Sequence, residues 1–258
     1  MRPSPRLRLL LVGAAVIVVL FVVATQTAGS AAGSPLAGRL TAADPSDDAP
    51  QTTSDFLTAI TEDVDRYWTG TFADAGLDEP RVGYAWIPPG AAVQSACGSL
   101  DESAAAYCPG DDTIYVSERF ADAIYAGALD RALPGSSQGY GGTVGDSAVA
   151  YIVAHEYGHQ VQDELGLYDR YGDQVPTMAF ELQADCFAGV WARSADDEGR
   201  LDAGDVHEAL DAALAVGDFD TASPGHHGTP EQRRAAWGTG FQAGEPGSCT
   251  TYLQAAGA

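Results

Sequence analysis

Two histidines and a glutamate, His155, Glu156 and His159, form a His-Glu-x-x-His string within a stretch of helical periodicity. A separation of four residues places both imidazoles on one face of a helix, where they can take two positions of a tetrahedral zinc site. Glu156 can lie beside the metal without binding it and accept a proton from water as general base. The alternative is two surface histidines beside a solvated glutamate, but the chain has only five histidines in all.

A third ligand is expected from a second helix, because a catalytic zinc site needs three protein ligands and an open fourth position. Glu181 and Asp185 are four residues apart and so face the same way. We expect Glu181 to bind one Zn²⁺ ion together with the two histidines, and Asp185 to accept a hydrogen bond from the outer nitrogen of a ligating histidine. The alternative is a solvated acidic face, but the apolar neighbours predict a buried helix, and buried carboxylates need a cation or donors.

The four cysteines, Cys97, Cys108, Cys186 and Cys249, allow three disulfide pairings. Cys97 with Cys108 would close a short loop and leave Cys186 with Cys249 to tie a central helix to the carboxyl end. A four-cysteine zinc site is the alternative, but the Cys-x-x-Cys pairs that it needs are absent. On an ideal helix Cys186 points about 140° away from Glu181, which makes it a poor co-ligand.

Hydrophobic spacing predicts the elements that position these residues. A first helix, which Ser54 or Asp55 would cap, is followed by two strands, each bounded by Pro, Gly or Asp. The predicted helices are 53–69, 119–133, 144–167, 178–195, 205–216 and 230–241; the predicted strands are 82–87 and 113–116, and 135–145 is a Gly-rich loop. This pattern predicts an α+β fold rather than a regular βαβ repeat.

The amino-terminal part resembles a targeting segment. Three arginines precede an apolar run over 9–24, so we expect residues 1–28 to be a signal peptide or an N-terminal signal anchor. A buried core helix is the alternative, and it fits the flanking charges poorly. Residues 29–53 are rich in small and polar residues and are predicted to be a flexible linker to one domain at 54–258. The positive-inside rule then places that domain outside the cytoplasmic membrane, anchored to it or secreted.

The exported part is strongly acidic. It carries all 36 acidic residues and only 10 of the 13 arginines, which gives a formal charge of −26, and there is no lysine. Such a surface repels phosphates, so we expect no nucleic acid and no anionic lipid as partner of the soluble domain. Solubility in a salty exterior explains the charge better than a cation-binding role does.

Residues 154–160, 180–192 and 227–233 together resemble the putative neutral zinc metallopeptidase family of bacteria. The likeness runs from about Cys97 to Cys249, and it implies that 54–258 is a zinc metallopeptidase domain acting on a peptide or protein substrate. More broadly, His-Glu-x-x-His followed by Glu-x-x-x-Asp resembles the gluzincin metallopeptidases. That resemblance implies a small mixed sheet packed on the active-site helix, with further helices toward the carboxyl end. It also implies an edge strand that receives the substrate, for which 113–117 is the candidate.

His227 and Arg233 resemble the His-Pro-x-x-x-x-Arg element of membrane-associated gluzincins, in which both residues approach the active site. The resemblance implies that His227 stabilises the developing oxyanion as a catalytic residue, and that Arg233 holds His227 or a carboxylate in place. Gly228 replaces the proline of that element, and His226 competes for the role of His227. The alternative is purely structural: a loop that starts a helix, with Pro230 in its first turn.

Three functions therefore remain open at the level of sequence. The first is peptide-bond hydrolysis by zinc-activated water. The second is an exported, non-catalytic binding domain in which zinc is structural; it would need a fourth protein ligand, and the candidates are His207, His226 and His227. The third is a zinc hydrolase that acts on a non-peptide amide.

Overall fold

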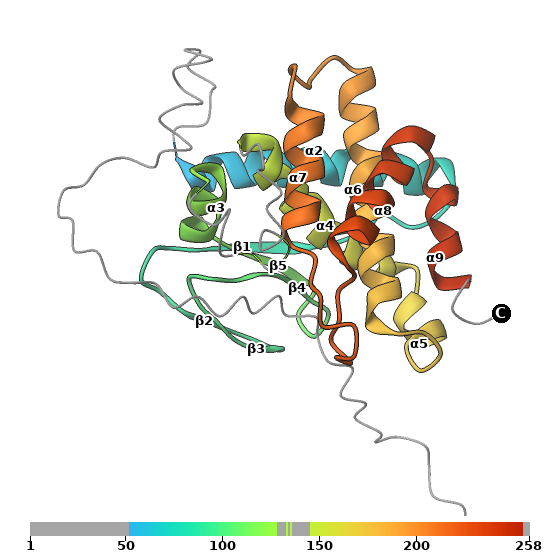
Figure 1. Cartoon of the computed structure of the whole chain (residues 1–258), viewed down its shortest axis with the longest axis horizontal. Helices are drawn as coiled ribbons and strands as arrows, with labels where there is room; N and C mark the ends of the chain where they lie inside the picture. The colour runs from blue at the N-terminus through green and yellow to red at the C-terminus, as the bar shows by residue number, and fades with distance from the viewer. Residues whose placement is uncertain (1–51, 128–132, 134, 136–144, 255–258) are drawn as a thin grey trace, which may run out of the picture.

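The computed structural model describes residues 52–127, 133, 135 and 145–254, and these form an α+β fold (Figure 1). The strands are β1 (Gly83–Ile87), β2 (Val93–Ser95), β3 (Gly98–Leu100), β4 (Ala105–Cys108) and β5 (Thr113–Ser117). The helices are α2 (Thr53–Asp74), α3 (Glu118–Tyr125), α4 (Asp146–Glu164), α5 (Leu167–Tyr171), α6 (Thr177–Asp197), α7 (Asp205–Ala215), α8 (Pro230–Ala243) and α9 (Thr251–Gln254), with a short 3₁₀ turn, η2 (Pro246–Thr250). The expected fold class is confirmed.

The targeting segment and nearly all of the linker, at 1–51, lie outside the described residues, as does most of the loop at 135–145. Within the described ranges, no helix combines the length and the apolar character that a membrane span requires. The placement of the domain relative to a membrane therefore stays a prediction.

A small mixed sheet has the strand order β1-β5-β4. β1 pairs with β5 in parallel, and β4 pairs with β5 antiparallel, so β5 is the central strand. The expectation that residues 113–117 form the edge strand is therefore wrong, and β4 is the edge on that side. The sequence did not indicate β4 because its Ala-Ala-Tyr-Cys residues are all buried and show no alternation. β2 and β3 form a separate antiparallel hairpin.

α4 is the buried centre of the domain. All its residues from Ala148 to Gln162 are buried, and the helix contacts β4, β5, α2, α6 and α7. It ends at Glu164, where Gly166 takes a φ of 62° that favours glycine. A helix that is covered on every side is held by its neighbours, so the residues that it carries are fixed in position.

Glycines allow α6 to approach both α4 and α8 closely. A Cβ at Gly158 of α4 would lie 3.0 Å from the Cα of Ala184 on α6. On the other face of α6, a Cβ at Gly189 would lie 2.0 Å from the carbonyl oxygen of Trp237, and one at Gly240 would lie 1.9 Å from that of Cys186. The backbones of the three helices are therefore in contact, which brings the two motif-bearing helices, α4 and α6, together.

Two details of the predicted helices are wrong. The side chain of Thr52, rather than Ser54 or Asp55, caps α2 by accepting a hydrogen bond from the amide of Asp55. α3 ends at Tyr125, eight residues earlier than expected, because Gly127 adopts a φ of 68° and stops the helix. α2 also ends later than expected, at Asp74, whereas α4, α6, α7 and α8 agree with the expected segments to within three residues at each end.

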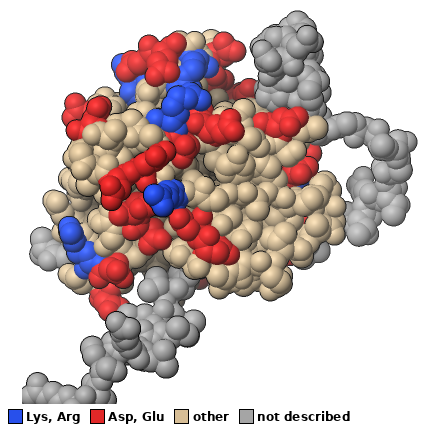
Figure 2. Space-filling model, turned by 180° about the vertical axis from the view of Figure 1, so that it is seen from behind, with Lys and Arg blue, Asp and Glu red and all other residues tan. Residues whose placement is uncertain are grey.

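Charge is distributed unevenly over the surface. Figure 2 shows the face opposite that of Figure 1, where acidic side chains gather around the few arginines and leave an uncharged area beside them. This agrees with the acidic composition, and the expected lack of a nucleic acid partner stays a prediction.

Candidate metal centre

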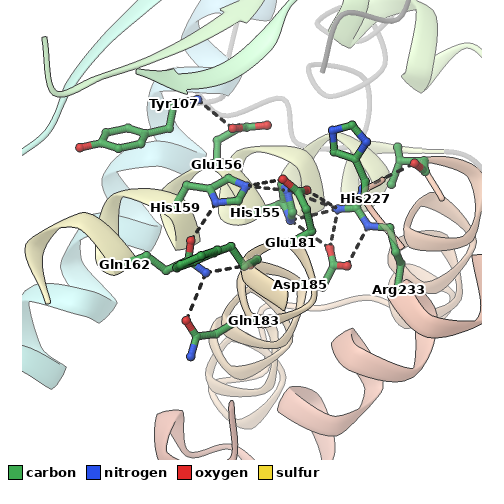
Figure 3. Close-up of polar contacts among 12 residues, drawn as sticks. Tyr107, His155, Glu156, His159, Gln162, Glu181, Gln183, Asp185, His227 and Arg233 are labelled. Carbon is green, nitrogen blue, oxygen red and sulfur yellow. Dashed lines mark hydrogen bonds and ion pairs between the residues drawn. The ribbon is translucent and has the colours of Figure 1, made fainter. Parts of the chain in front are cut away.

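α4 presents the two histidines toward each other in the interior (Figure 3). The Nε2 atoms of His155 and His159 are 3.2 Å apart, and the two side chains are buried. Glu181 of α6 faces both: its Oε2 lies 3.3 Å from Nε2 of His155, and its Oε1 lies 3.5 Å from Nε2 of His159. The structure thus brings together the three residues that the sequence suggested as ligands, each offering one atom within 4.8 Å of the others.

The outer nitrogen of each histidine faces an acceptor. Nδ1 of His155 lies 2.9 Å from Oδ1 of Asp185, and Nδ1 of His159 lies 2.9 Å from Oε1 of Gln162. Each Nδ1 therefore carries a proton in the arrangement that satisfies these acceptors, which leaves a lone pair on each Nε2. Two lone pairs that face each other at this distance repel unless a cation or a proton lies between them.

Glu181 provides the strongest sign that this centre binds a cation. Its side chain is fully buried, and among the described residues neither carboxylate oxygen has a hydrogen-bond partner; the nearest guanidinium nitrogen, Nη2 of Arg233, is 3.7 Å from Oε2. Burial raises the pKa of this carboxyl, but the two histidines lower it further, so the pKa lies well below its usual value and the group is ionised. A buried carboxylate without donors is costly, and a divalent cation would compensate for it. The ligand set of two imidazoles and one carboxylate is one that catalytic Zn²⁺ uses.

Asp185 lies where the sequence suggested, but its partners are more numerous than expected. Arg233 of α8 donates from Nε to Oδ2 and from Nη2 to Oδ1, both at 2.8 Å, and the Tyr151 hydroxyl donates to Oδ1 at 2.6 Å. The pKa of Asp185 is lowered: burial raises it, but the charges of Arg233 and His155 outweigh burial. Arg233 thus holds a carboxylate rather than His227, which was the other expectation for it.

Glu156 lies at the edge of the sheet, outside the three-ligand group. Its Oε2 accepts the backbone N–H of Tyr107 in β4 at 2.8 Å, and its Oε1 is buried without a partner (Figure 3). The side chain is 1% exposed, so the carboxylate is held by one oxygen and has the other available. The sequence did not indicate Tyr107, because its part in the site is played by the backbone of a strand that the sequence did not predict.

The adjacent residues His226 and His227 contact Asp218 in different ways. His226 is buried and its Nδ1 lies 2.6 Å from Oδ1 of Asp218, whereas His227 donates its backbone N–H to Oδ2 at 2.8 Å. The imidazole of His227 is 25% exposed and lies on the side of the centre where Arg233 enters (Figure 3). Of the two, His227 is therefore the one that a substrate could reach.

The loop before α8 differs from a His-Pro element. Gly228 has a φ of 106°, which proline cannot adopt, so the glycine is required by the backbone here. Thr229 caps α8 in a capping box with Gln232, and Pro230 stands in the first turn, as the structural alternative expected. Both features hold together: the loop starts the helix and also places His227 at the rim of the centre.

Of the three possible disulfide pairings, the structure has the one that closes one short loop and one long loop. Cys97 is bonded to Cys108, and Cys186 is bonded to Cys249. Cys108 ends β4 directly after Tyr107. The four-cysteine zinc site is therefore excluded.

The family of the chain follows from its match to a family model. The model described as "Putative neutral zinc metallopeptidase" matches residues 6–252. The chain belongs to this family. The match is wider than the likeness seen by motif, since it also covers the region before Cys97.

Similar curated proteins of this kind come from several bacteria. "Uncharacterized protein YpfJ" of Escherichia coli strain K12 is 39% identical over 165 residues, which is 57% of this chain and 53% of that protein. "Uncharacterized protein Rv2575" of Mycobacterium tuberculosis strain H37Rv and "Uncharacterized protein Mb2605" of Mycobacterium bovis are each 33% identical over 188 residues, which is 63% of this chain and 60% of theirs. The chain thus spans between half and two thirds of the length of these relatives. No solved structure matches the chain significantly.

Proposed function

We propose that this chain is a zinc-dependent peptidase, in which His155, His159 and Glu181 hold one Zn²⁺ ion and Glu156 is the general base. The observation that carries the proposal is the buried Glu181 carboxylate: its oxygens have no hydrogen-bond partner among the described residues, and they lie 3.3 Å and 3.5 Å from the Nε2 atoms of His155 and His159. A bound divalent cation would compensate the charge of this carboxylate and also bind the two imidazoles. Membership of a zinc metallopeptidase family supports the same metal and the same reaction class.

Zn²⁺ held there would act as a Lewis acid and lower the pKa of water to about 7. Glu156 accepts a proton from the attacking water at its free oxygen while Tyr107 holds the other oxygen. The water oxygen then bonds to the carbonyl carbon, the C–N bond breaks, and Glu156 returns the proton to the leaving nitrogen. The same carboxylate thus acts as base and then as acid.

An extended peptide or protein segment is the proposed substrate. β4 is an edge strand, and the backbone N–H of Tyr107 points away from β5 toward Glu156. A peptide added along this edge would bring its backbone to the general base by strand pairing. The partial exposure of His227 at the rim supports a role for its imidazole as donor to the carbonyl oxygen as negative charge develops. Arg233 holds the site rather than the substrate, because its buried guanidinium donates to Asp185 and lies 3.3 Å from Nε2 of His155 and 3.7 Å from Oε2 of Glu181.

We also propose that the domain works outside the cytoplasmic membrane, attached through the amino-terminal segment or released from it. Two disulfides and the lack of any free cysteine support an oxidising compartment. The arginines that precede the apolar run support the orientation.

The proposal is tested with the full-length chain loaded with zinc, on a denatured protein substrate. Glu156→Gln should retain one equivalent of zinc and lose activity by about 10²–10⁴-fold, the usual contribution of a general base. Glu164→Gln is the matched control, because Glu164 lies on the same helix and is exposed; it should retain activity. Zinc binding with equal hydrolysis by the Glu156→Gln protein would refute the mechanism, and zinc binding with no hydrolysis by any form would favour the non-catalytic domain.

A further inference from the structure

Gln162 is a fully buried polar residue one helical turn beyond His159 on α4. Its Oε1 lies 2.9 Å from Nδ1 of His159, and its Nε2 donates to the carbonyl oxygen of Phe180 at 2.8 Å. The Phe180 carbonyl can only accept, so the amide group of Gln162 cannot be reversed without losing this bond. Its oxygen is therefore fixed toward the histidine.

A second amide continues this chain of hydrogen bonds. Gln183 of α6, which is 2% exposed, accepts at Oε1 from Nε2 of Gln162 at 3.2 Å. Nε2 of Gln183 then donates to the carbonyl oxygen of Cys249 at 3.2 Å. The donors all run in one direction, from His159 through both glutamines to a backbone carbonyl, and that carbonyl belongs to a residue bonded to α6 by a disulfide.

The Tyr168 hydroxyl also reaches this place, 2.9 Å from Oε1 of Gln162 and 3.1 Å from Nδ1 of His159. Without Gln162, this hydroxyl could donate to Nδ1 and so favour the tautomer with the proton on Nε2. In that tautomer Nε2, the nitrogen that faces Glu181, could not bind the proposed metal. With Gln162 in place, that tautomer is disfavoured, because the lone pair on Nδ1 of His159 would face the amide oxygen of Gln162 at 2.9 Å and repel it. Gln162 therefore decides which nitrogen of His159 is available.

We infer that Gln162 is a positioning residue for the metal centre: it fixes the proton of His159 on Nδ1, and Gln183 with the Cys249 carbonyl holds Gln162 in that orientation. The inference rests on the proposed metal site. It adds that different kinds of groups orient the two histidines. His155 is held by the ionised Asp185, whereas His159 is held by a neutral chain of amides.

The test measures the zinc affinity of the full-length chain by competition with a chelator. Gln162→Leu should lower zinc affinity by about 10–100-fold, the usual effect of removing a group that orients a ligand. Gln160→Leu is the matched control: Gln160 lies on the same helix, is equally buried, and bonds to the Arg81 carbonyl and to Glu164 but to no ligand. The control should bind zinc as the parent does.

Two further variants keep the test decisive if Gln162→Leu does not fold. Gln162→Glu, which when protonated can still accept from His159 and donate to Phe180, should recover most of the zinc affinity. Gln183→Leu removes only the outer link and should show a smaller loss in the same direction. Nitrogen NMR of the metal-free chain should show His159 protonated on Nδ1 in the parent and on Nε2, or on both nitrogens in exchange, in Gln162→Leu.

The outcomes separate this inference from the proposed peptidase activity. Equal zinc affinity of the Gln162→Leu and parent proteins, or an equal loss in Gln160→Leu, would overturn the inference even if peptides are hydrolysed. Zinc affinity that falls as expected in a protein without hydrolysis would support the inference and refute the activity. An unchanged tautomer of His159 in Gln162→Leu would overturn the inference whether or not zinc binds.

Discussion

Tyr107 donates its backbone N–H to the carboxylate of Glu156, although the two residues are 49 positions apart in the chain. The bond joins the edge of the sheet to the buried helix α4. It leaves one oxygen of Glu156 without a partner. The sheet therefore has a direct part in the site, because it orients the proposed general base.

Replacing Tyr107 tests this bond, since proline removes the N–H and alanine keeps it. An N–H that does not pair with β5 can be lost at an edge strand without breaking the sheet. We expect kcat of Tyr107→Pro to be about 10–100-fold below that of Tyr107→Ala, from a hydrogen bond to a charged group worth about 1.5–3 kcal/mol. Zinc content, measured in parallel, should be the same in both. Equal kcat values in the two variants would show that the bond has no catalytic role.

Gly158→Ala tests the close approach of α4 and α6. The added methyl would lie 3.0 Å from both the Cα and the carbonyl oxygen of Ala184, so the helices must separate slightly. We expect the free energy of unfolding to fall by about 1–3 kcal/mol, as for overpacked cores. Zinc affinity should also fall, because Glu181 would move away from the two histidines. Gly70→Ala in α2, where a methyl meets nothing within 4 Å, is the control and should leave zinc affinity unchanged.

Zinc binding should depend on pH through His155. In the metal-free protein, burial and the charge of Arg233 lower the pKa of this imidazole, but the carboxylates of Asp185 and Glu181 outweigh them and raise it to about 9. The unfolded value is about 6.5. The stabilisation that comes from the protonated imidazole is therefore fully present below about pH 6.5 and is lost as pH rises through about 9.

Zn²⁺ needs the same nitrogen without its proton, so zinc affinity should rise between about pH 6.5 and 9 as proton competition fades. Calorimetric titration at pH 7.5, about one unit above the reference value, should show a proton released on zinc binding. The measurement uses buffers that differ in ionisation enthalpy. An affinity independent of pH over this window would contradict the expectation.

The two disulfides should stabilise the fold to different extents. The Cys186–Cys249 bond spans 63 residues and the Cys97–Cys108 bond spans 11. In the chain-entropy model the longer loop contributes about 4 kcal/mol and the shorter one about 3 kcal/mol. Urea unfolding of the two double-alanine variants should therefore give the larger loss for Cys186 with Cys249. The opposite order would indicate that local packing around β4 matters more than loop length.

The sequence predicted the ligand set because its chemistry follows from spacing along single helices. His155 and His159 are one helical turn apart, and so are Glu181 and Asp185, so each pair could be placed on one face without knowing the fold. Only their meeting depended on tertiary structure, which Gly158 makes possible through its close contact with α6.

The residues that were not predicted from the sequence act through hydrogen bonds between different helices and strands. Gln162 and Gln183 lie on different helices, 21 positions apart, so their hydrogen bond could not be inferred from spacing along one helix. Tyr107 contributes a backbone group from a strand of four buried residues without alternation, which periodicity cannot separate from a loop or a helix fragment. A signal was available for Tyr151, one turn before His155, and for Gln162, one turn after His159, because residues three or four apart on a helix are neighbours.

Each disulfide includes a cysteine that directly follows a residue orienting a group of the centre. Cys108 follows Tyr107, which orients Glu156, and Cys186 follows Asp185, which orients His155. A newly made chain whose thiols are still reduced lacks both braces. With the proposed export, both braces would form only after the chain reaches an oxidising compartment, so the groups that orient Glu156 and His155 would be fixed last.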